Sequence, residues 1–297
     1  MIIPPYLKKG DTVAIVCTAR KFFKEDAQPA IALLESWGLR VKLGKTIGLD
    51  YFQLGGTDEQ RTADFNEQIQ DPEVKAIWVA RGGYGTVRII DLIDFSAFQS
   101  DPKWIVGFSD ITTLHSHINN LGVATTHAIM PFTVPTAPES VKQTLHDALF
   151  GKALTYQIAP HENNVLGEAT GELVGGNLSI LYSLLGSPSA IQTQNKILFI
   201  EDLDEYLYHL DRMMQNLKRN NYFTTCKAII VGGMTDMHDN QIPYGQNAYE
   251  IIGAIAAQYY IPICFDFPAG HVPDNRALIF GQTVNLSIKK DLVTLSF

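Results

Sequence analysis

The sequence predicts an α/β protein with a doubly wound parallel sheet in its N-terminal domain and a smaller mixed β/α domain after it. Short, almost continuously apolar runs alternate with amphipathic segments through the first half, which is typical of a parallel sheet covered by helices on both faces. A proline-rich break then separates this half from a second series of strands and helices. The length of 297 residues also fits about two domains. We expect domains at residues 1–150 and 165–297.

The N-terminal elements follow from the position of each apolar run. Thr57 and Gln60 form a capping-box pattern, which predicts a helix that runs to about residue 70. A first helix, ending at Gly38, places Ile31, Leu33, Leu34 and Trp37 on its inner face. A third helix is expected over residues 110–120, and another after residue 85. The expected strands are residues 11–17, 39–43, 75–80, 104–107 and 123–126.

The second half has its own pattern after Pro131, Pro135 and Pro138. A helix over residues 139–150 and a mostly polar stretch through residue 164 form the expected junction. The expected strands are residues 196–200, 227–231 and 262–265. The expected helices are residues 177–185, 205–219 and 246–260, and a β-rich tail covers residues 277–297.

The amino-acid composition indicates which binding partners and which cellular compartment suit the protein. Lys and Arg number 23 against 31 Asp and Glu, a net charge of −8, which disfavours nucleic acid and anionic membranes as partners. Three widely spaced cysteines predict buried free thiols in a reducing compartment. The N-terminus lacks a signal-peptide layout, and no apolar run approaches the ~20 residues of a membrane span. These features predict a cytoplasmic protein.

Polar residues that follow parallel strands are the first candidates for chemistry. The segment Gly107–Thr112 turns directly from a strand into a helix and would expose the Ser109 hydroxyl. The backbone N–H of Asp110 could then stabilise the oxyanion of an acyl-transfer intermediate. A serine before a helix is more often a simple N-cap, and taken alone that interpretation is the stronger one.

The segment Arg81–Gly85 follows the third strand, and its glycine amides can approach a ligand closely. They could supply a second oxyanion donor or bind a phosphate. The spacing of a dinucleotide fingerprint and the Lys of a Walker loop are both missing. A simple tight turn explains this segment equally well.

Acidic and histidine residues supply further candidates. Glu201 comes first in an acidic run at the end of an apolar strand, where a carboxylate could orient a histidine. His271 lies in a rigid loop of small residues and prolines. His127 ends the fifth strand, where it could contact the substrate or support the residues that do. His115 and His117 are interpreted as packing or surface residues. The loop at residues 236–240 lacks a paired metal-ligand pattern, so we expect a solvated turn there and no metal.

Five segments together resemble the LD-carboxypeptidase family of serine peptidases. This family includes the muramoyltetrapeptide carboxypeptidases and the microcin C immunity peptidases. The resemblance covers nearly the whole chain in order and spacing. It departs after His127, where many relatives have Gly-Pro and this chain has Ala-Ile. The matching segments are Arg81–Gly85, Gly107–Thr112, Gly175–Ser179, Ile200–Asp202 and Gly270–His271.

The resemblance implies a triad of Ser109, His271 and Glu201, no cofactor and often a homodimer. The implied reaction releases the terminal D-alanine of murein tetrapeptides during peptidoglycan recycling. Within that mechanism, the amides of Asp110 and Gly83 are expected to bind the oxyanion. The guanidinium of Arg81 suits the free carboxylate of the peptide. The expected substrate contacts are Arg81, Gly82 and His127.

Three other functions compete with this one. A microcin-immunity-type peptidase would act on a peptidyl or aminoacyl nucleotide and would need an aromatic platform for the base. A non-catalytic ligand-binding protein could share the fold. An α/β-hydrolase esterase has the same Ser–Glu–His order, but Ile111 replaces the second glycine of its nucleophile motif.

Overall fold

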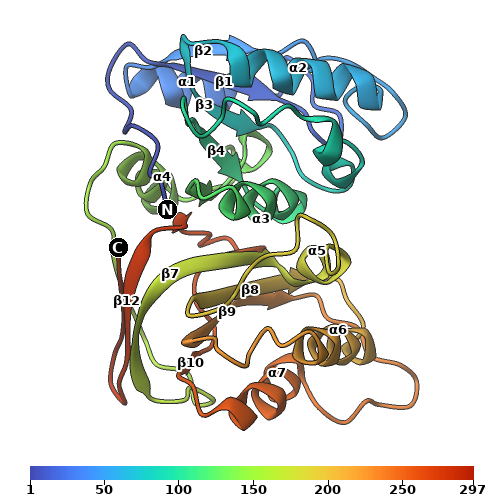
Figure 1. The fold of residues 1–297 in the computed structure, drawn as a ribbon, viewed down its shortest axis with the longest axis vertical. Coiled ribbons are helices and arrows are strands. Elements are labelled where there is room, and N and C mark those ends of the chain that lie inside the picture. The colour runs from blue at the N-terminus through green and yellow to red at the C-terminus, as the bar shows by residue number, and fades with distance from the viewer.

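The computed structural model describes residues 1–297 and contains two sheets, one above the other in Figure 1. The upper sheet has the strand order β11-β5-β4-β3-β1-β2. Strands β1 to β5 are parallel, and β11 pairs with β5 in the antiparallel sense. The predicted fold class is confirmed. The strands are β1 (Thr12–Val16), β2 (Arg40–Leu43), β3 (Val74–Val79), β4 (Trp104–Gly107), β5 (Thr125–His127) and β11 (Leu278–Phe280).

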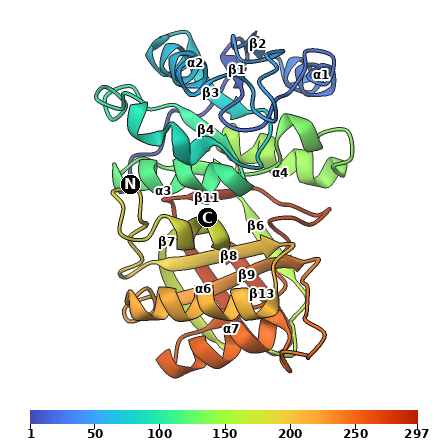
Figure 2. The same cartoon turned by 90° about the vertical axis from the view of Figure 1, so that its right-hand side faces the viewer.

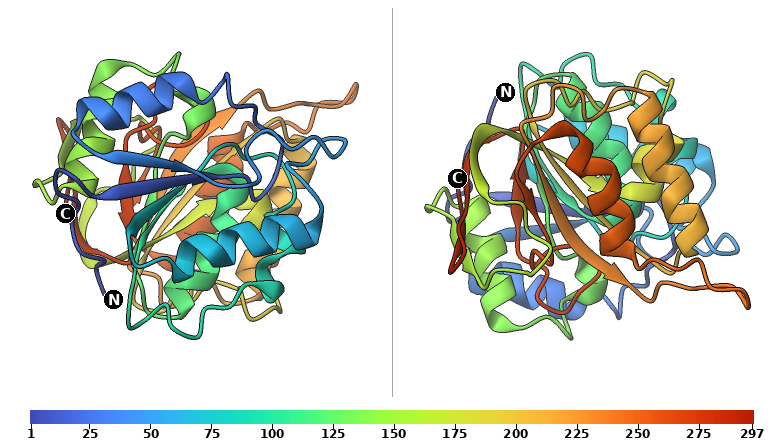
Figure 3. Two further views of the ribbon diagram at one scale, coloured as in Figure 1. Left: turned by 90° about the horizontal axis from the view of Figure 1, so that it is seen from above. Right: turned by 90° about the horizontal axis from the view of Figure 1, so that it is seen from below.

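Helices cover both faces of the upper sheet (Figures 2 and 3). Side chains of β1 alternate between the faces, so Val13 and Ile15 pack with α1 and α4, while Ala14 and Val16 pack with α2 and α3. The predicted capping box at Thr57 is present and begins α2. The helices are α1 (Gln28–Ser36), α2 (Asp58–Gln70), α3 (Thr112–Asn120) and α4 (Glu139–Leu149).

Two helix predictions need correction near the strand ends. No α-helix begins directly after residue 85. The chain makes two short 3₁₀ turns there, η1 (Thr86–Arg88) and η2 (Ile90–Leu92). A 3₁₀ turn, η3 (Ser109–Ile111), also precedes α3, so this helix begins at Thr112. The left-handed φ of 66° at Ser109 explains the later start, because an α-helix cannot include that conformation.

The lower sheet has the order β10-β9-β8-β7-β12-β13-β6. Strands β7 to β10 are parallel, and α5, α6 and α7 pack on one face of them (Figure 1). The remaining strands pair in the antiparallel sense. The strands are β6 (Thr155–Ile158), β7 (Gly167–Asn177), β8 (Ile197–Leu203), β9 (Ala228–Thr235), β10 (Ile263–Cys264), β12 (Thr283–Ile288) and β13 (Val293–Ser296). The helices are α5 (Leu178–Ser183), α6 (Leu207–Arg219) and α7 (Ala248–Ala256), followed by the 3₁₀ turn η5 (Ala257–Tyr259).

Strands β6 and β7 were not predicted from the sequence, and β7 lies at the centre of the lower sheet. Glycine, glutamate and asparagine make up most of β7, and all three are depleted in strands. Gly175 shows why glycine is required here. Its φ is +140°, and a Cβ atom on it would lie 1.9 Å from the carbonyl oxygen of Phe199 in β8.

The two halves of the chain are closely joined. Strand β11 comes from the C-terminal half but completes the upper sheet, and β6 belongs to the lower sheet although it lies in the expected junction. One hydrophobic core includes Val13 and Trp78 of the upper sheet and Phe199 of the lower sheet. The chain between β9 and α7 projects from the body (Figure 3). None of the helices is long and apolar enough to cross a membrane.

Candidate active site

A cavity of about 530 Å³ lies where loops of the two sheets meet. The loops after β1, β3, β4 and β5 form one wall, at the carboxyl ends of the parallel strands, where ligands of such sheets bind. The ends of β7 and β8 and the loop before β11 form the other wall. The lining residues used below are Arg20, Arg81, Gly82, Gly83, Phe108, Ser109, Asp110, Phe132, Asn177, Ser179, Asp202 and His271.

Ser109 occupies a tight turn between β4 and α3. Its φ of 66° lies in the left-handed region, which is uncommon for a residue other than glycine. Such strain persists only where the surroundings enforce it, and it is characteristic of a nucleophile turn. The lack of a side chain on Gly82 lets the loop after β3 approach Ser109 closely. A Cβ atom on Gly82 would lie 3.1 Å from Ser109 Cβ and 3.3 Å from its Oγ.

His271 is paired with Glu201. Glu201 Oε2 lies 2.7 Å from His271 Nδ1 and also accepts the backbone N–H of His271 at 3.1 Å. Glu201 has no exposed surface. A Cβ atom on the intervening Gly270 would lie 2.6 Å from Glu201 Oε2, so this close approach needs glycine. Burial lowers the pKa of His271, but the neighbouring carboxylates of Glu201 and Asp202 raise it more, and the net pKa is above 6.5.

Ser109 and His271 face the same cavity from different sheets. Phe108 links them, because its ring packs on the imidazole with centroids 4.8 Å apart and it directly precedes Ser109 in the chain. The imidazole is hydrogen bonded to Glu201 and makes no hydrogen bond to Ser109 in this structure. Catalytic hydrogen bonds are often loose before substrate binds. The arrangement suits a hydroxyl nucleophile with a carboxylate-oriented base.

The glycine loop after β3 lies beside Ser109. Gly83 has a φ of +108°, and a Cβ atom there would clash with the Arg20 side chain at 2.6 Å. Gly83 and Asp110 both line the cavity. The Asp110 side chain is buried and accepts the backbone N–H of Thr86 at 2.9 Å. Its carboxyl group therefore points into the protein, and its backbone remains beside Ser109.

Arg81 supplies positive charge to the cavity. Its guanidinium stacks on the Phe132 ring, 4.1 Å from the centroid. Burial and the nearby Arg20 cation both lower the pKa of Arg81. Two guanidinium groups on one wall can bind an anionic group of a ligand.

His127 lies outside the cavity lining. It is completely buried, with its ring packed among Phe108, Phe199 and Phe280. Burial lowers the pKa of His127 well below the ordinary value, so the imidazole is neutral. The structure therefore does not bring this residue to the cavity surface. His115 is also buried, and its Nε2 lies 2.8 Å from the Gly107 carbonyl oxygen, as expected of a packing residue.

Several cavity residues were not singled out from the sequence. Asp202 accepts hydrogen bonds from Asn177 Nδ2 at 2.9 Å and from Ser179 N at 2.8 Å. Burial and the adjacent Glu201 raise the pKa of Asp202 to about 7. The sequence signal was present, since Asn177 caps α5 and Asp202 stands in the acidic run after the apolar strand. No group of three or more His, Cys, Asp or Glu side chains is placed to hold a metal ion.

Comparisons with known proteins agree with this architecture. Residues 13–128 match the model of the LD-carboxypeptidase N-terminal domain, and residues 170–286 match that of the C-terminal domain. A probable murein peptide carboxypeptidase from Bacillus subtilis is 39% identical over 94% of this chain and 89% of its own length. The murein tetrapeptide carboxypeptidase of Pseudomonas aeruginosa is 28% identical over 92% of each chain. The microcin C7 self-immunity protein MccF of Escherichia coli is 26% identical over 98% of this chain and 94% of its own.

Solved structures share the whole fold. The muramoyltetrapeptide carboxypeptidase of Oxalobacter formigenes has a TM-score of 0.87 at 24% identity, covering 96% of this chain and 98% of its own. An MccF-like protein of Bacillus anthracis has a TM-score of 0.86 at 23% identity and covers 100% of this chain and 99% of its own. Both family models match in order, and the relatives named as carboxypeptidases support a peptidase activity. The chain belongs to the LD-carboxypeptidase family.

Proposed function

We propose that this protein is a serine-type LD-carboxypeptidase that releases terminal D-alanine from murein tetrapeptides. The observation that carries the proposal is the placement of Ser109, in a left-handed turn, and of the Glu201-paired His271 on one cavity. The names of the Bacillus and Pseudomonas relatives support murein peptides as substrates. Peptidoglycan recycling in the cytoplasm, by a homodimer, completes the proposal.

In the proposed reaction, Ser109 Oγ attacks the carbonyl carbon of the L,D-amide bond. His271 accepts the hydroxyl proton and then passes it to the leaving amine of D-alanine. Water, activated by the same imidazole, hydrolyses the acyl-enzyme. Glu201 holds the imidazole with Nδ1 protonated and stabilises its cationic form. The amides of Asp110 and Gly83 stabilise the oxyanion, and one such donor typically lowers the barrier by ~3 kcal/mol.

A carboxypeptidase must also recognise the free end of its substrate. Arg81 is the proposed partner of the terminal carboxylate, with Gly82 leaving room beside Ser109. His127 lies behind this surface, where its neutral ring packs against Phe108, so its proposed role is to support the wall and not to touch the peptide.

Replacing Ser109 tests the proposal directly. Ser109→Ala should reduce D-alanine release from a purified murein tetrapeptide by at least about 10³-fold. Ser183→Ala is the matched control, because this exposed serine in α5 bonds only the Ile180 carbonyl and should keep full activity. Undiminished release by the Ser109 variant would refute the proposal.

A nucleotide-linked substrate is the second candidate. The Phe132 ring is 49% exposed and lines the cavity, where it could stack on a base. The relationship to MccF also favours this reading. Parallel assays with a murein tetrapeptide and an aminoacyl sulfamoyl nucleoside separate the two substrates. Labelling of Ser109 by a fluorophosphonate would exclude the third alternative, a protein that binds ligands without catalysis.

A further inference from the structure

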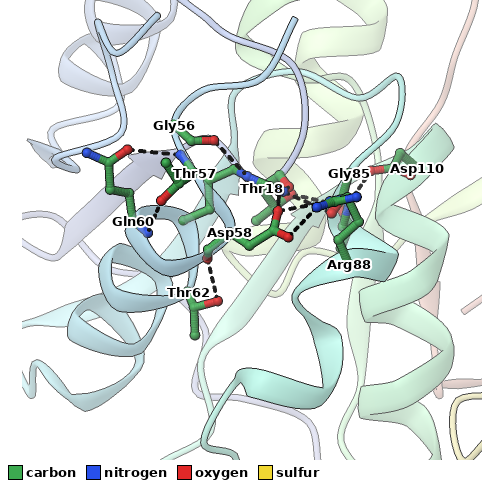
Figure 4. Close-up of polar contacts among 11 residues, drawn as sticks. Thr18, Gly56, Thr57, Asp58, Gln60, Thr62, Gly85, Arg88 and Asp110 are labelled. Carbon is green, nitrogen blue, oxygen red and sulfur yellow. Dashed lines mark hydrogen bonds and ion pairs between the residues drawn. The ribbon is translucent and has the colours of Figure 1, made fainter. Parts of the chain in front are cut away.

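A network of ion pairs and hydrogen bonds connects the start of α2 with Thr18, Gly85 and Asp110 (Figure 4). Arg61 of α2 is fully buried, and its guanidinium donates hydrogen bonds to the carbonyl oxygens of Gly85, at 2.9 Å, and of Thr18. Asp58 is its counter-ion and also pairs with Arg88. The guanidinium thus ties the end of the glycine loop to the loop after β1.

Asp110 makes the second connection. Its side chain is 1% exposed, and its Oδ2 accepts the backbone N–H of Thr86 at 2.9 Å. The Thr86 hydroxyl in turn lies 2.8 Å from that of Thr18. The residue that follows Ser109 is therefore bonded to the residue that follows the glycine loop. This bond spans 24 residues and joins the ends of β3 and β4.

These bonds fix the glycine loop, residues 81–85, at both ends. Before the loop, Ala80 N donates to the Val16 carbonyl at 2.8 Å, and after it, Thr86 N donates to Asp110. Between these points three of the five loop residues are glycines, so the loop has only two side chains that can pack against the rest of the protein. Gly82 nevertheless approaches Ser109 so closely that a Cβ atom would lie 3.1 Å from Ser109 Cβ.

We propose that the Asp110 carboxyl group is a positioning group, which holds the glycine loop at the distance from Ser109 that oxyanion binding requires. Arg61 supports the same loop from the Gly85 carbonyl. The inference rests on two parts of the proposed function, Ser109 as the nucleophile and the glycine loop as an oxyanion donor. Misplacing a catalytic group by about 1 Å can cost about 10²-fold in rate, so a single buried bond at this point has a large effect.

The geometry argues for a functional role beyond stability. Taking ionisable groups out of water is costly, and a shape-matched apolar contact is often as stable. Burial raises the pKa of Asp110, and its Oδ1 has no hydrogen-bond partner. The contact with Thr86 needs only an acceptor oxygen, so an amide side chain can replace the carboxyl group.

The experiment compares Asp110→Ala with Asp110→Asn and with a matched buried aspartate. Asp64 is also 1% exposed and its Oδ2 accepts a threonine backbone N–H, that of Thr46, at 2.8 Å, but it lies outside the cavity lining. For each variant we would measure kcat, KM, the thermal unfolding midpoint and the rate constant of Ser109 phosphonylation by a fluorophosphonate.

Asp110→Ala should lower kcat and the phosphonylation rate at least tenfold, with KM within about twofold of the wild-type value. Asp110→Asn should recover most of that loss. Asp64→Ala should lower the unfolding midpoint and leave both rates unchanged. Wild-type rates in Asp110→Ala, no recovery in Asp110→Asn, or an equal loss of rate in Asp64→Ala would overturn the inference.

The two readouts separate this inference from the substrate assignment. If the wild-type protein is phosphonylated at Ser109 but releases no D-alanine, the proposed substrate is wrong, and the phosphonylation rates still decide the role of Asp110. If the wild-type Ser109 does not react, the proposed nucleophile and the positioning role are both overturned.

Discussion

Glu201 Oε2 contacts His271 twice, at the ring Nδ1 and at the backbone nitrogen. A single buried carboxylate thus fixes both the direction of the imidazole and the path of the loop that carries it. The second contact is independent of the protonation state of the ring, because the backbone N–H is always a donor. The loop should therefore keep its position when the histidine ionises.

Glu201→Gln should lower kcat by about 10³-fold or more, because an amide can stabilise the wrong tautomer and cannot stabilise imidazolium. The base must be neutral to accept the serine proton. Glu201 raises the pKa of His271 above 6.5, so the acidic limb of the kcat/KM profile should move to lower pH in the variant. Asp147→Asn, which disturbs a carboxylate–histidine pair in α4, should leave the profile unchanged. An unmoved limb would contradict the assignment of His271.

Arg81→Met should raise KM for the tetrapeptide by about tenfold or more and change kcat little, because a terminal carboxylate is bound equally in ground and transition states. Arg81→Lys should restore only part of the affinity, since lysine lacks the planar fork that stacks on Phe132. A substrate with an amidated C-terminus provides the control. If Arg81→Met raises KM for the amidated substrate by the same factor, the guanidinium does not bind the terminal carboxylate.

Gly82→Ala should lower kcat at least tenfold with little loss of stability. The new Cβ atom would lie 3.3 Å from Ser109 Oγ, while the Gly82 backbone is not in the left-handed region. Gly253→Ala is the control, because this glycine lies inside α7 with its nearest neighbour 3.7 Å away. It should stabilise the protein by about 0.5–1 kcal/mol and keep full activity. Urea unfolding and D-alanine release measure the two effects, and full activity in Gly82→Ala would be the contrary result.

Asp202 should make stability depend on pH. Its pKa is about 7 in the folded protein against an ordinary value of 3.8, so between these values the folded chain retains a proton that the unfolded chain has lost. Stability must then fall as pH rises through this range. Asp202→Asn cannot titrate. The free energy of unfolding of the wild type minus that of the variant should therefore decrease from pH 5 to pH 8, by on the order of a few kcal/mol. Denaturant titrations should show it, and a constant difference would exclude the raised pKa.

The sequence predicted the upper sheet well because its central strands β1, β3 and β4 are separate, mainly apolar runs. The turn at Ser109 also follows from local pattern, since a strand and a helix adjoin there. The pairing of Glu201 with His271 is different, because 70 residues separate them and only the assembled lower sheet brings them together. The resemblance to a known family identified both residues, whereas periodicity could not.

Other features could not be predicted because they depend on tertiary contacts, which leave little trace in the local sequence pattern. Strand β7 is stabilised by its pairing with β8 and β12 and not by its own residue types. Its glycines and polar residues therefore gave no strand pattern in the sequence. The end of β5 placed His127 beside the expected site, but the ring packs against Phe199 of the other sheet and is covered. Asp202 belongs to an acidic run in the sequence, and only its contacts with β7 and α5 explain why it is buried.

Strand β11 has a consequence for how this chain can be divided. A fragment that stops before Leu278 would leave β5 as an open edge, and such edges promote aggregation. A fragment that starts after α4 would carry β11 without the strand that normally pairs with it. The N-terminal and C-terminal regions should therefore aggregate when they are expressed as separate proteins. Mixing the two fragments should restore solubility only if β11 of one fragment pairs with β5 of the other.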